Sequence, residues 1–235
     1  MWIMLKSWEN LPTNMQTEAV RPYYQMLKKR KVSLAMKRAI DILGAGILTI
    51  LLSPVLAVLA IWIKTDSKGP VFYRQERVTQ YGRVFRIYKF RTMVVGADKK
   101  GPLVTQKEDA RITRAGAKIR KLRLDELPQI FNILTGDMSF VGTRPEVAKY
   151  VNRYSDEMKA TLLLPAGVTS ETSIRYKDED EIIEKYQKET GEDTDEIYVK
   201  HILPEKMKYN LDYIRKFSVW KDLRIMIETA MAVLR

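Results

Sequence analysis

The longest apolar stretch of the chain runs from Ala39 to Ile63 and contains few polar residues. As a single helix, these 25 residues would measure about 37 Å, against a bilayer hydrocarbon core of roughly 30 Å. Pro54 lies inside the stretch, and a proline removes a backbone donor from a helix interior, so the pattern predicts a kink or a break there. Neither arm is then long enough to cross a membrane by itself. The alternatives are an ordinary single span and a helix that enters one leaflet and returns.

Basic residues flank this stretch on both sides. Lys37 and Arg38 precede it, and eight lysines and arginines follow it between residues 64 and 91. Positively charged flanks favour the cytoplasmic side of a membrane, so both ends are expected there. The favoured prediction is therefore a re-entrant helix-break-helix segment with its break at Ser53 and Pro54, and the single span remains the alternative.

The rest of the chain predicts a mostly helical α/β domain with one small sheet. Between residues 69 and 93, bases alternate with apolar or aromatic residues around Tyr81 and Gly82, which predicts a β-hairpin. Its bases are either solvated or form a phosphate-binding face. Helical periodicity predicts further helices, the acidic one being either solvated or a lid. These helices cover residues 112–122, 127–134, 147–163, 182–190, 201–215 and 218–234. The last is amphipathic and suited to a membrane surface.

Composition and charge narrow the chemistry. The chain has no cysteine and one histidine, His201, so thiolate metal sites and cysteine nucleophiles are excluded and histidine catalysis has little room. Its formal net charge is +12. Residues 177–196 carry ten acids and three lysines, which leaves the remainder at +19. Such an excess indicates a polyanionic partner, namely nucleic acid, an anionic membrane surface or a phosphorylated substrate.

Two adjacent carboxylates, Asp125 and Glu126, lie among bases at the start of a predicted helix. Arg120 and Arg123 precede them, and Pro128 suits the first helical turn. An acidic pair at this position often serves only as a cap and a partner of the helix dipole. Beside bound phosphate it has two further uses, because a carboxylate can bind Mg²⁺ that bridges phosphate oxygens or can attack phosphorus. Residue spacing leaves these interpretations open.

Several short motifs occur in order along residues 34–235. They are Lys37-Arg38-Ala39-Ile40-Asp41, Ser53-Pro54, Tyr88-Lys89-Phe90-Arg91-Thr92-Met93, Leu124-Asp125-Glu126-Leu127-Pro128-Gln129, Gly136-Asp137-Met138-Ser139-Phe140-Val141-Gly142, Arg144-Pro145, and Ser218 to Leu223 with Asp222. Together they resemble the bacterial sugar transferases, monotopic polyprenyl-phosphate phosphoglycosyl transferases that begin glycan assembly on a lipid carrier. The resemblance is to the small type that consists of the catalytic domain alone.

The resemblance implies a mechanism and a role for each motif residue. Asp125 would attack the β-phosphate of a UDP-sugar, release UMP and hold the phosphosugar until polyprenyl phosphate accepts it. Glu126 would be the Mg²⁺ ligand. Lys89, Arg120 and Arg144 match basic positions of the family motifs and would orient the phosphates. Arg91 and Arg123 are further candidates on charge alone.

The chain departs from the family pattern at two positions. Thr143 stands where the family commonly has proline, which keeps Arg144 but loosens the turn before it. The second departure is in Pro165-Ala166-Gly167-Val168-Thr169, where the family has Arg-Pro-Gly-Ile-Thr. Pro165 therefore stands at the position of the family's arginine. One expected base is therefore absent, and Arg175 and Lys177 are its candidate replacements.

These inferences divide the chain into an N-terminal extension (1–33), a re-entrant membrane helix with basic flanks (34–68) and a cytoplasmic catalytic domain at the membrane surface (69–235). The expected location is the cytoplasmic face of the bacterial inner membrane. The expected partners are a UDP-sugar, polyprenyl phosphate and the phospholipid membrane, without nucleic acid. A homodimer is one option for the assembly. The competing readings are a membrane-anchored basic binding module, which leaves the carboxylates among the bases without a role, and an inactive scaffold of the same fold.

Overall fold

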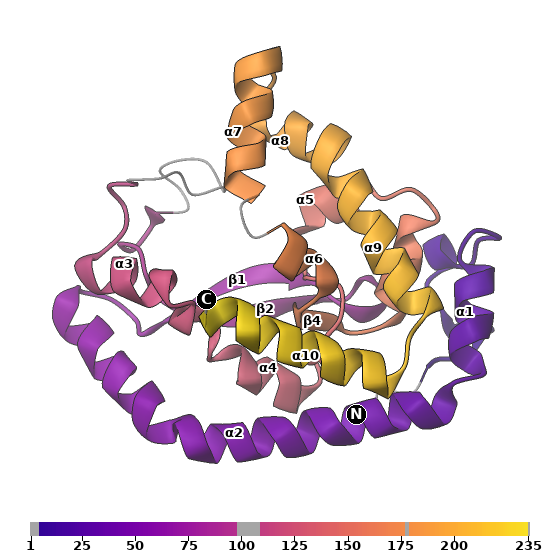
Figure 1. Ribbon diagram of the computed structural model, residues 1–235, viewed down its shortest axis with the longest axis horizontal. Coiled ribbons are helices and arrows are strands. Elements are labelled where there is room, and N and C mark those ends of the chain that lie inside the picture. The colour runs from indigo at the N-terminus through magenta and orange to yellow at the C-terminus, as the bar shows by residue number, and fades with distance from the viewer. Residues whose placement is uncertain (1–4, 98–108, 177–178, 235) are drawn as a thin grey trace.

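The computed structural model describes residues 5–97, 109–176 and 179–234. Helices predominate and surround two small sheets (Figure 1). The α-helices are α1 (Arg21–Lys28), α2 (Lys31–Asp66), α3 (Arg114–Lys121), α4 (Gln129–Thr135), α5 (Ala148–Val151), α6 (Glu171–Arg175), α7 (Glu179–Thr190), α8 (Thr194–Ile197), α9 (Leu203–Arg215) and α10 (Val219–Leu234). A π-helical turn, Tyr198–Ile202, joins α8 to α9. The predicted mostly helical architecture is confirmed.

Helix α2 underlies the whole molecule (Figure 1). It is continuous over 36 residues with Pro54 inside it, and it turns upward toward α3 at one end. Proline is a usual cause of such a bend. Pro54 has no amide to donate to the carbonyl of Ile50, and the hydroxyl of Ser53 donates to that carbonyl instead at 2.8 Å. Of the predicted kink or break, the structure has a bend in a continuous helix, and Ser53 satisfies the acceptor that Pro54 leaves open.

The apolar surface of α2 is largely uncovered by protein. This helix is long and apolar enough to cross a membrane, and 11% of its most apolar window is buried. Exposed apolar side chains follow it along most of its length, including Ile50, Leu51 and Ile61. A buried core helix would hide such residues, so most of the apolar surface of α2 is left for contacts outside this chain's own core.

A cluster of buried charges fixes the first half of α2 to the domain. Lys37 donates to Asp222 of α10 and to a backbone carbonyl of the strand β3 (Met138–Val141), both at 2.7 Å. Asp41 accepts hydrogen bonds from the hydroxyl of Ser139 and from a β3 backbone amide, both at 3.0 Å. Arg38 donates to carbonyls at the end of α4. We call Lys37, Arg38, Asp41 and Asp222 the α2 anchor.

The predicted β-hairpin is present. Strands β1 (Phe72–Val78) and β2 (Val84–Phe90) pair antiparallel around a turn in which Tyr81 has a positive φ. Phe85 and Ile87 bury one face of the hairpin in a cluster with residues of α4 and β3. The register pairs Lys89 with Tyr73, and Lys89 lies on the same face of the hairpin as Phe85 and Ile87. The hairpin therefore carries Lys89 beside the start of α4.

A second sheet was not predicted. Strand β3 pairs in parallel with β4 (Ala166–Thr169). At the end of this pair Gly142 and Gly167 lie so close that a Cβ on Gly167 would sit 2.1 Å from the amide nitrogen of Gly142. The motif Pro165–Thr169 thus has a structural role in pairing the strands.

The helix predicted over residues 147–163 is wrong in extent. Only α5 and a 3-10 helix, Met158–Leu163, form there. The hydroxyl of Ser155 accepts a hydrogen bond from the amide of Met158 at 3.3 Å. Serine and its neighbours Asn152 and Asp156 compete with helical hydrogen bonds through their side chains, which explains the interruption.

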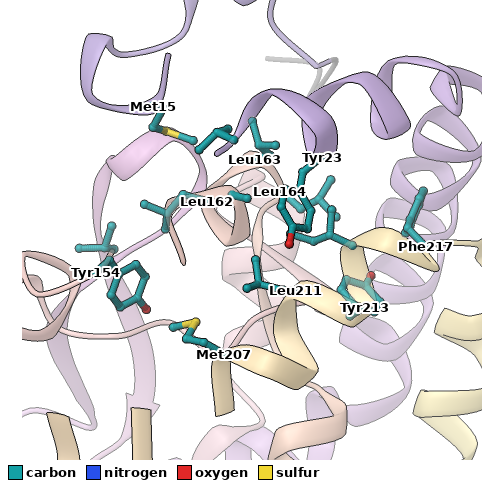
Figure 2. Packing of buried hydrophobic residues seen from close by; sticks show 14 of the residues in the cluster. Met15, Tyr23, Tyr154, Leu162, Leu163, Leu164, Met207, Leu211, Tyr213 and Phe217 are labelled. Carbon is teal, nitrogen blue, oxygen red and sulfur yellow. The ribbon is translucent and has the colours of Figure 1, made fainter. Parts of the chain in front are cut away.

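The N-terminal extension packs into the main core. Met15 and Tyr23 lie in the same cluster as Leu163 and Leu164 (Figure 2). The hydroxyl of Tyr23 donates to Glu157 at 2.5 Å. The described part of the extension, residues 5–33, therefore shares one hydrophobic core with the rest of the protein.

Candidate active site

The carboxylate pair lies on a short 3-10 helix, Leu124–Glu126, directly before α4. Arg123 enters this turn in the left-handed conformation, with φ 53 and ψ 22. Such a conformation costs a non-glycine residue of order 1–3 kcal/mol and is concentrated at functional sites. Hydrogen bonds between residues three apart continue from this turn into the start of α4, so the carboxylate pair is joined directly to that helix.

A cavity of about 590 Å³ opens beside this turn. Its walls come from the β-hairpin, the segment from α3 to α4, the turn after β3, and the region from α6 to α9. Six of the residues predicted from sequence line it together: Lys89, Arg120, Arg123, Asp125, Glu126 and Arg144. This volume lies within the usual range of small-molecule sites.

Glu126 is held by two cations. Its Oε1 accepts from Lys89 Nζ at 3.0 Å and from Arg144 at 2.6 Å. Burial alone would raise the pKa of Glu126, but the charges of Arg144 and Lys89 outweigh it and bring the pKa below its usual range. Glu126 is therefore a permanently charged carboxylate that fixes both cations at the cavity wall. We call these three residues the Glu126 cluster.

Asp125 has a different environment. Among the described residues it forms no ion pair within 4.0 Å, although it lines the cavity. Burial raises the pKa of Asp125, and the charge of Lys89 lowers it less than burial raises it. Adjacent carboxylates with pKa values shifted in opposite directions are suited to separate chemical roles. The structure thus distinguishes the unpaired Asp125 from the clamped Glu126, which residue spacing could not do.

Two other predicted phosphate ligands, Arg91 and Arg175, do not line this cavity. Arg91 is 4% exposed, and its guanidinium donates to three backbone carbonyls after α2 at 2.6 to 2.9 Å. It therefore closes the end of α2. Arg175 is exposed on α6, stacks over the ring of Tyr209 and does not line the cavity. Lys177 lies outside the described residues. Pro165, where a base was expected, is buried away from this cavity.

Two lining residues were missed by the sequence reasoning. Arg77 of β1 lines the cavity and donates to Gln75 at 2.7 Å. Gln129 is 1% exposed, and its Nε2 has no hydrogen-bond partner within the part of the chain that the structure describes. The four-residue spacing from Asp125 was the available signal for Gln129. Arg77 would have required the register of the hairpin.

The end of the cavity beyond Arg144 is lined by hydrogen-bonded carboxylates. The hydroxyl of Tyr198 donates to Glu146 at 2.5 Å, and Lys206 donates to Glu179 of α7 at 2.8 Å. Burial, with Glu146 and Glu179 next, raises the pKa of Tyr198 far above its usual range. Glu146 and Glu179 are therefore already paired, whereas the bases near Asp125 and Glu126 outnumber those two acids, so this part of the lining attracts phosphate.

The carboxylates of the cavity can be compared with the ligands that Mg²⁺ requires. Among the described residues no group of three or more His, Cys, Asp or Glu side chains could hold a metal ion. Mg²⁺ commonly takes one or two carboxylates together with substrate phosphates. Asp125 and Glu126 supply two carboxylates beside a basic, phosphate-attracting wall. They fit a magnesium ion that binds together with a diphosphate, and they do not fit one held by protein ligands alone.

These features define a protein with one long, largely exposed apolar helix and a basic cavity around the adjacent carboxylates Asp125 and Glu126. The chain belongs to the bacterial sugar transferase family, whose model matches residues 32–235. It is 36% identical over 202 residues to UDP-N-acetylgalactosamine-undecaprenyl-phosphate N-acetylgalactosaminephosphotransferase of Aeromonas hydrophila, covering 85% of this chain and 44% of that protein.

Two relatives carry a different sugar in their names. UDP-glucose:undecaprenyl-phosphate glucose-1-phosphate transferase of Klebsiella pneumoniae is 34% identical over 84% of this chain and 40% of that protein. The protein of the same name from Caulobacter vibrioides is 34% identical over 84% of this chain and 69% of its own length. The chain thus spans less than half the length of the Aeromonas and Klebsiella relatives, and its relatives differ in sugar.

Proposed function

We propose that this protein transfers a sugar phosphate from a UDP-sugar to polyprenyl phosphate, releases UMP, and forms a covalent intermediate on Asp125. The observation that carries the proposal is the contrast between the unpaired Asp125 and the clamped Glu126 at the basic end of one cavity. The names of the relatives supply the substrate classes. Such a transfer would place the first sugar of a glycan on its lipid carrier.

In the first step, an Asp125 carboxylate oxygen attacks the β-phosphorus of the UDP-sugar. A bond forms between that oxygen and phosphorus, and the bond to the bridging oxygen breaks, so UMP leaves with the electron pair. In the second step, a phosphate oxygen of the lipid attacks the same phosphorus and displaces the Asp125 carboxylate. No proton transfer from a histidine is needed in either step.

The bases of the cavity wall support both steps. Lys89 and Arg144 are held in place by Glu126, and Arg120 and Arg123 flank Asp125 on the same wall. Charge-assisted hydrogen bonds from such groups stabilise phosphate oxygens and reduce their repulsion of an attacking carboxylate. Mg²⁺, held by Glu126 or Asp125 together with the diphosphate, would add charge neutralisation at the phosphates. Glu126→Gln is then expected to weaken the Mg²⁺ dependence.

For the membrane, we propose that α2 is re-entrant, so that both of its ends face the cytoplasm of a bacterial cell. The basic flanks, the bend and the uncovered apolar surface support this topology. Cysteines at positions 30 and 68 can be labelled from either side of sealed vesicles. Labelling of both from the cytoplasmic side is expected, and labelling from opposite sides would contradict the proposal.

The central experiment measures UMP release from a panel of UDP-sugars with polyprenyl phosphate and Mg²⁺. Without the lipid acceptor, the wild type is expected to retain radiolabelled phosphosugar on the protein, and Asp125→Asn is not. Arg175→Gln serves as a matched control, because Arg175 lies outside the cavity. Full activity of Asp125→Asn would overturn the nucleophile assignment. Vesicle binding without any UMP release would favour the basic binding module.

A further inference from the structure

A second cavity, of about 260 Å³, adjoins the first. The two cavities share one wall, and we call its residues the shared wall: Gln75, Arg77, Lys89, Arg120 and Asp125. Three of these five side chains are bases, and the fifth is the proposed nucleophile. A phosphate at the shared wall is therefore in reach of both compartments.

The remaining linings of the two cavities differ in chemistry. The large cavity has Glu126, Glu146 and Glu179 in addition to its bases. The small cavity has Asp125 as its acidic residue among the described lining, and much of its other surface is apolar. Its larger apolar residues are Pro70, Phe72, Phe90, Met93, Val94 and Val95, and the bases Arg91 and Arg111 also line it. An apolar compartment beside bases suits a molecule with phosphate at one end and hydrocarbon at the other.

The small cavity lies next to the lipid-facing helix. Its lining begins at Pro70, shortly after α2 ends at Asp66. Phe90 packs in one cluster with Leu59 and Ile63 of α2. Phe72, Val94 and Val95 are 37%, 45% and 61% exposed, so the apolar lining reaches the protein surface. A hydrocarbon chain can therefore pass from the surface of α2 into this cavity without crossing the polar one.

The geometry of phosphoryl transfer requires a common phosphate position. The attacking and leaving oxygens lie roughly in line through phosphorus. After Asp125 has displaced UMP, the acceptor must attack from the side that UMP has left. The acceptor phosphate therefore occupies the position of the departed nucleotide phosphate. The rest of the two ligands differs, because an isoprenoid chain needs apolar contacts and a nucleoside needs polar ones.

We infer that the small cavity binds the first isoprenoid units of the lipid phosphate, that the large cavity binds the nucleotide sugar, and that their phosphates alternate at the shared wall. This inference rests on the proposed function. It assigns acceptor specificity to residues of the small cavity, above all Val95 and Phe72, which the reaction chemistry alone does not identify.

The test separates the two half-reactions. The first is formation of the labelled phosphosugar-protein and UMP without acceptor, and the second is discharge of that label by undecaprenyl phosphate. Val95→Asp is expected to lower the kcat/KM of discharge by about tenfold or more, since losing the burial of a valine costs roughly 1.5 kcal/mol or above. The rate of label formation is expected to stay within about twofold, a change below 0.5 kcal/mol.

Two further variants complete the test. Val84→Asp is the matched control, because Val84 is also an exposed valine, 52% exposed on β2, and lines neither cavity; neither half-reaction should change. Val95→Leu keeps the apolar surface and should discharge as the wild type does. Equal loss of both half-reactions in Val95→Asp, or no loss in either, would overturn the inference. Absence of label in the wild type would instead refute the covalent mechanism proposed above.

Discussion

Two charge clusters in this protein use the same residue types in different surroundings. In the α2 anchor, the side chains of Lys37 and Asp222 are 6% and 8% exposed, and Asp222 also accepts a hydrogen bond from Tyr213. In the Glu126 cluster, Lys89 and Glu126 are 21% and 14% exposed and face the large cavity. The anchor is buried and its charged groups are paired, whereas Asp125, next to the Glu126 cluster, forms no ion pair within 4.0 Å among the described residues.

This difference separates structural charge from reactive charge. A buried ion pair with all its hydrogen bonds made holds elements together and has nothing left for a ligand. A cluster with one unpaired carboxylate at a cavity wall retains both binding capacity and reactivity. Substitutions in the α2 anchor should therefore affect folding, and substitutions around Asp125 should affect chemistry.

The largest expected effect belongs to Asp125. Asp125→Asn should lower kcat for UMP release by about 10⁴-fold or more, as the loss of a nucleophile does in other enzymes. The melting temperature should stay close to the wild-type value, since Asp125 forms no ion pair with the residues that the structure describes. Asp222→Asn makes the same chemical change in the α2 anchor, and there the melting temperature should fall. A large loss of stability in Asp125→Asn would erase the contrast between the clusters.

The next effect concerns Lys37. Lys37→Met leaves the buried carboxylate of Asp222 without its cation, which should lower the free energy of unfolding by about 3–5 kcal/mol. Urea unfolding in detergent micelles measures this loss. The double variant Lys37→Met with Asp222→Leu should recover much of it, because no buried charge then remains unpaired. Additive losses in the double variant would contradict the assignment of these residues as one ion pair.

A smaller effect, on pH dependence, distinguishes the neighbours of Asp125. Because burial raises the pKa of Asp125, the acid limb of kcat/KM should lie at a higher pH than for an ordinary aspartate. Arg120 lowers this pKa and Glu126 raises it. Arg120→Gln should therefore move the acid limb to higher pH, and Glu126→Gln should move it to lower pH. Profiles of kcat/KM for the UDP-sugar measure both, and shifts in the same direction would count against Asp125 as the titrating nucleophile.

Local patterns predicted much of the fold. The apolar run of α2, the β-hairpin and the closing helices α9 and α10 each have a periodicity that is visible within one segment. Strands β3 and β4 were missed because each has four residues and the pair joins segments far apart in sequence. Pro54 predicted a kink or a break, and the choice between the two is seen only in the structure, where the helix continues across Pro54.

The site residues that belong to the family motifs could be predicted from the sequence. Lys89, Arg120 and Arg144 were identified through the family resemblance, and the structure brings them to one cavity. Arg91 belongs to the same motif as Lys89, yet its donors are used by backbone carbonyls. The sequence cannot show which base of a motif is already satisfied, because hydrogen-bond satisfaction depends on the tertiary fold.

The smallest expected effect compares two buried amides on α4. Asn132 is 0% exposed, accepts from the amide of Tyr88 at 2.8 Å and donates to the carbonyl of Arg86 at 3.1 Å. Gln129 lies one turn earlier, is also buried, and its Nε2 has no partner in the described part of the chain. An unsatisfied buried donor costs about 1–3 kcal/mol, so an apolar replacement of similar shape should not destabilise.

Gln129→Met is therefore expected to raise the free energy of unfolding by about 1 kcal/mol, whereas Asn132→Leu should lower it by a similar amount or more, since it leaves two backbone groups unpaired. Urea unfolding of both variants measures the difference. Equal destabilisation by the two substitutions would show that Gln129 has a structural partner. If Gln129→Met is more stable but has a lowered kcat/KM, the Gln129 amide donates to the substrate. A neutral side chain whose donor the fold leaves unpaired would then serve the substrate, as Asp125 is proposed to do.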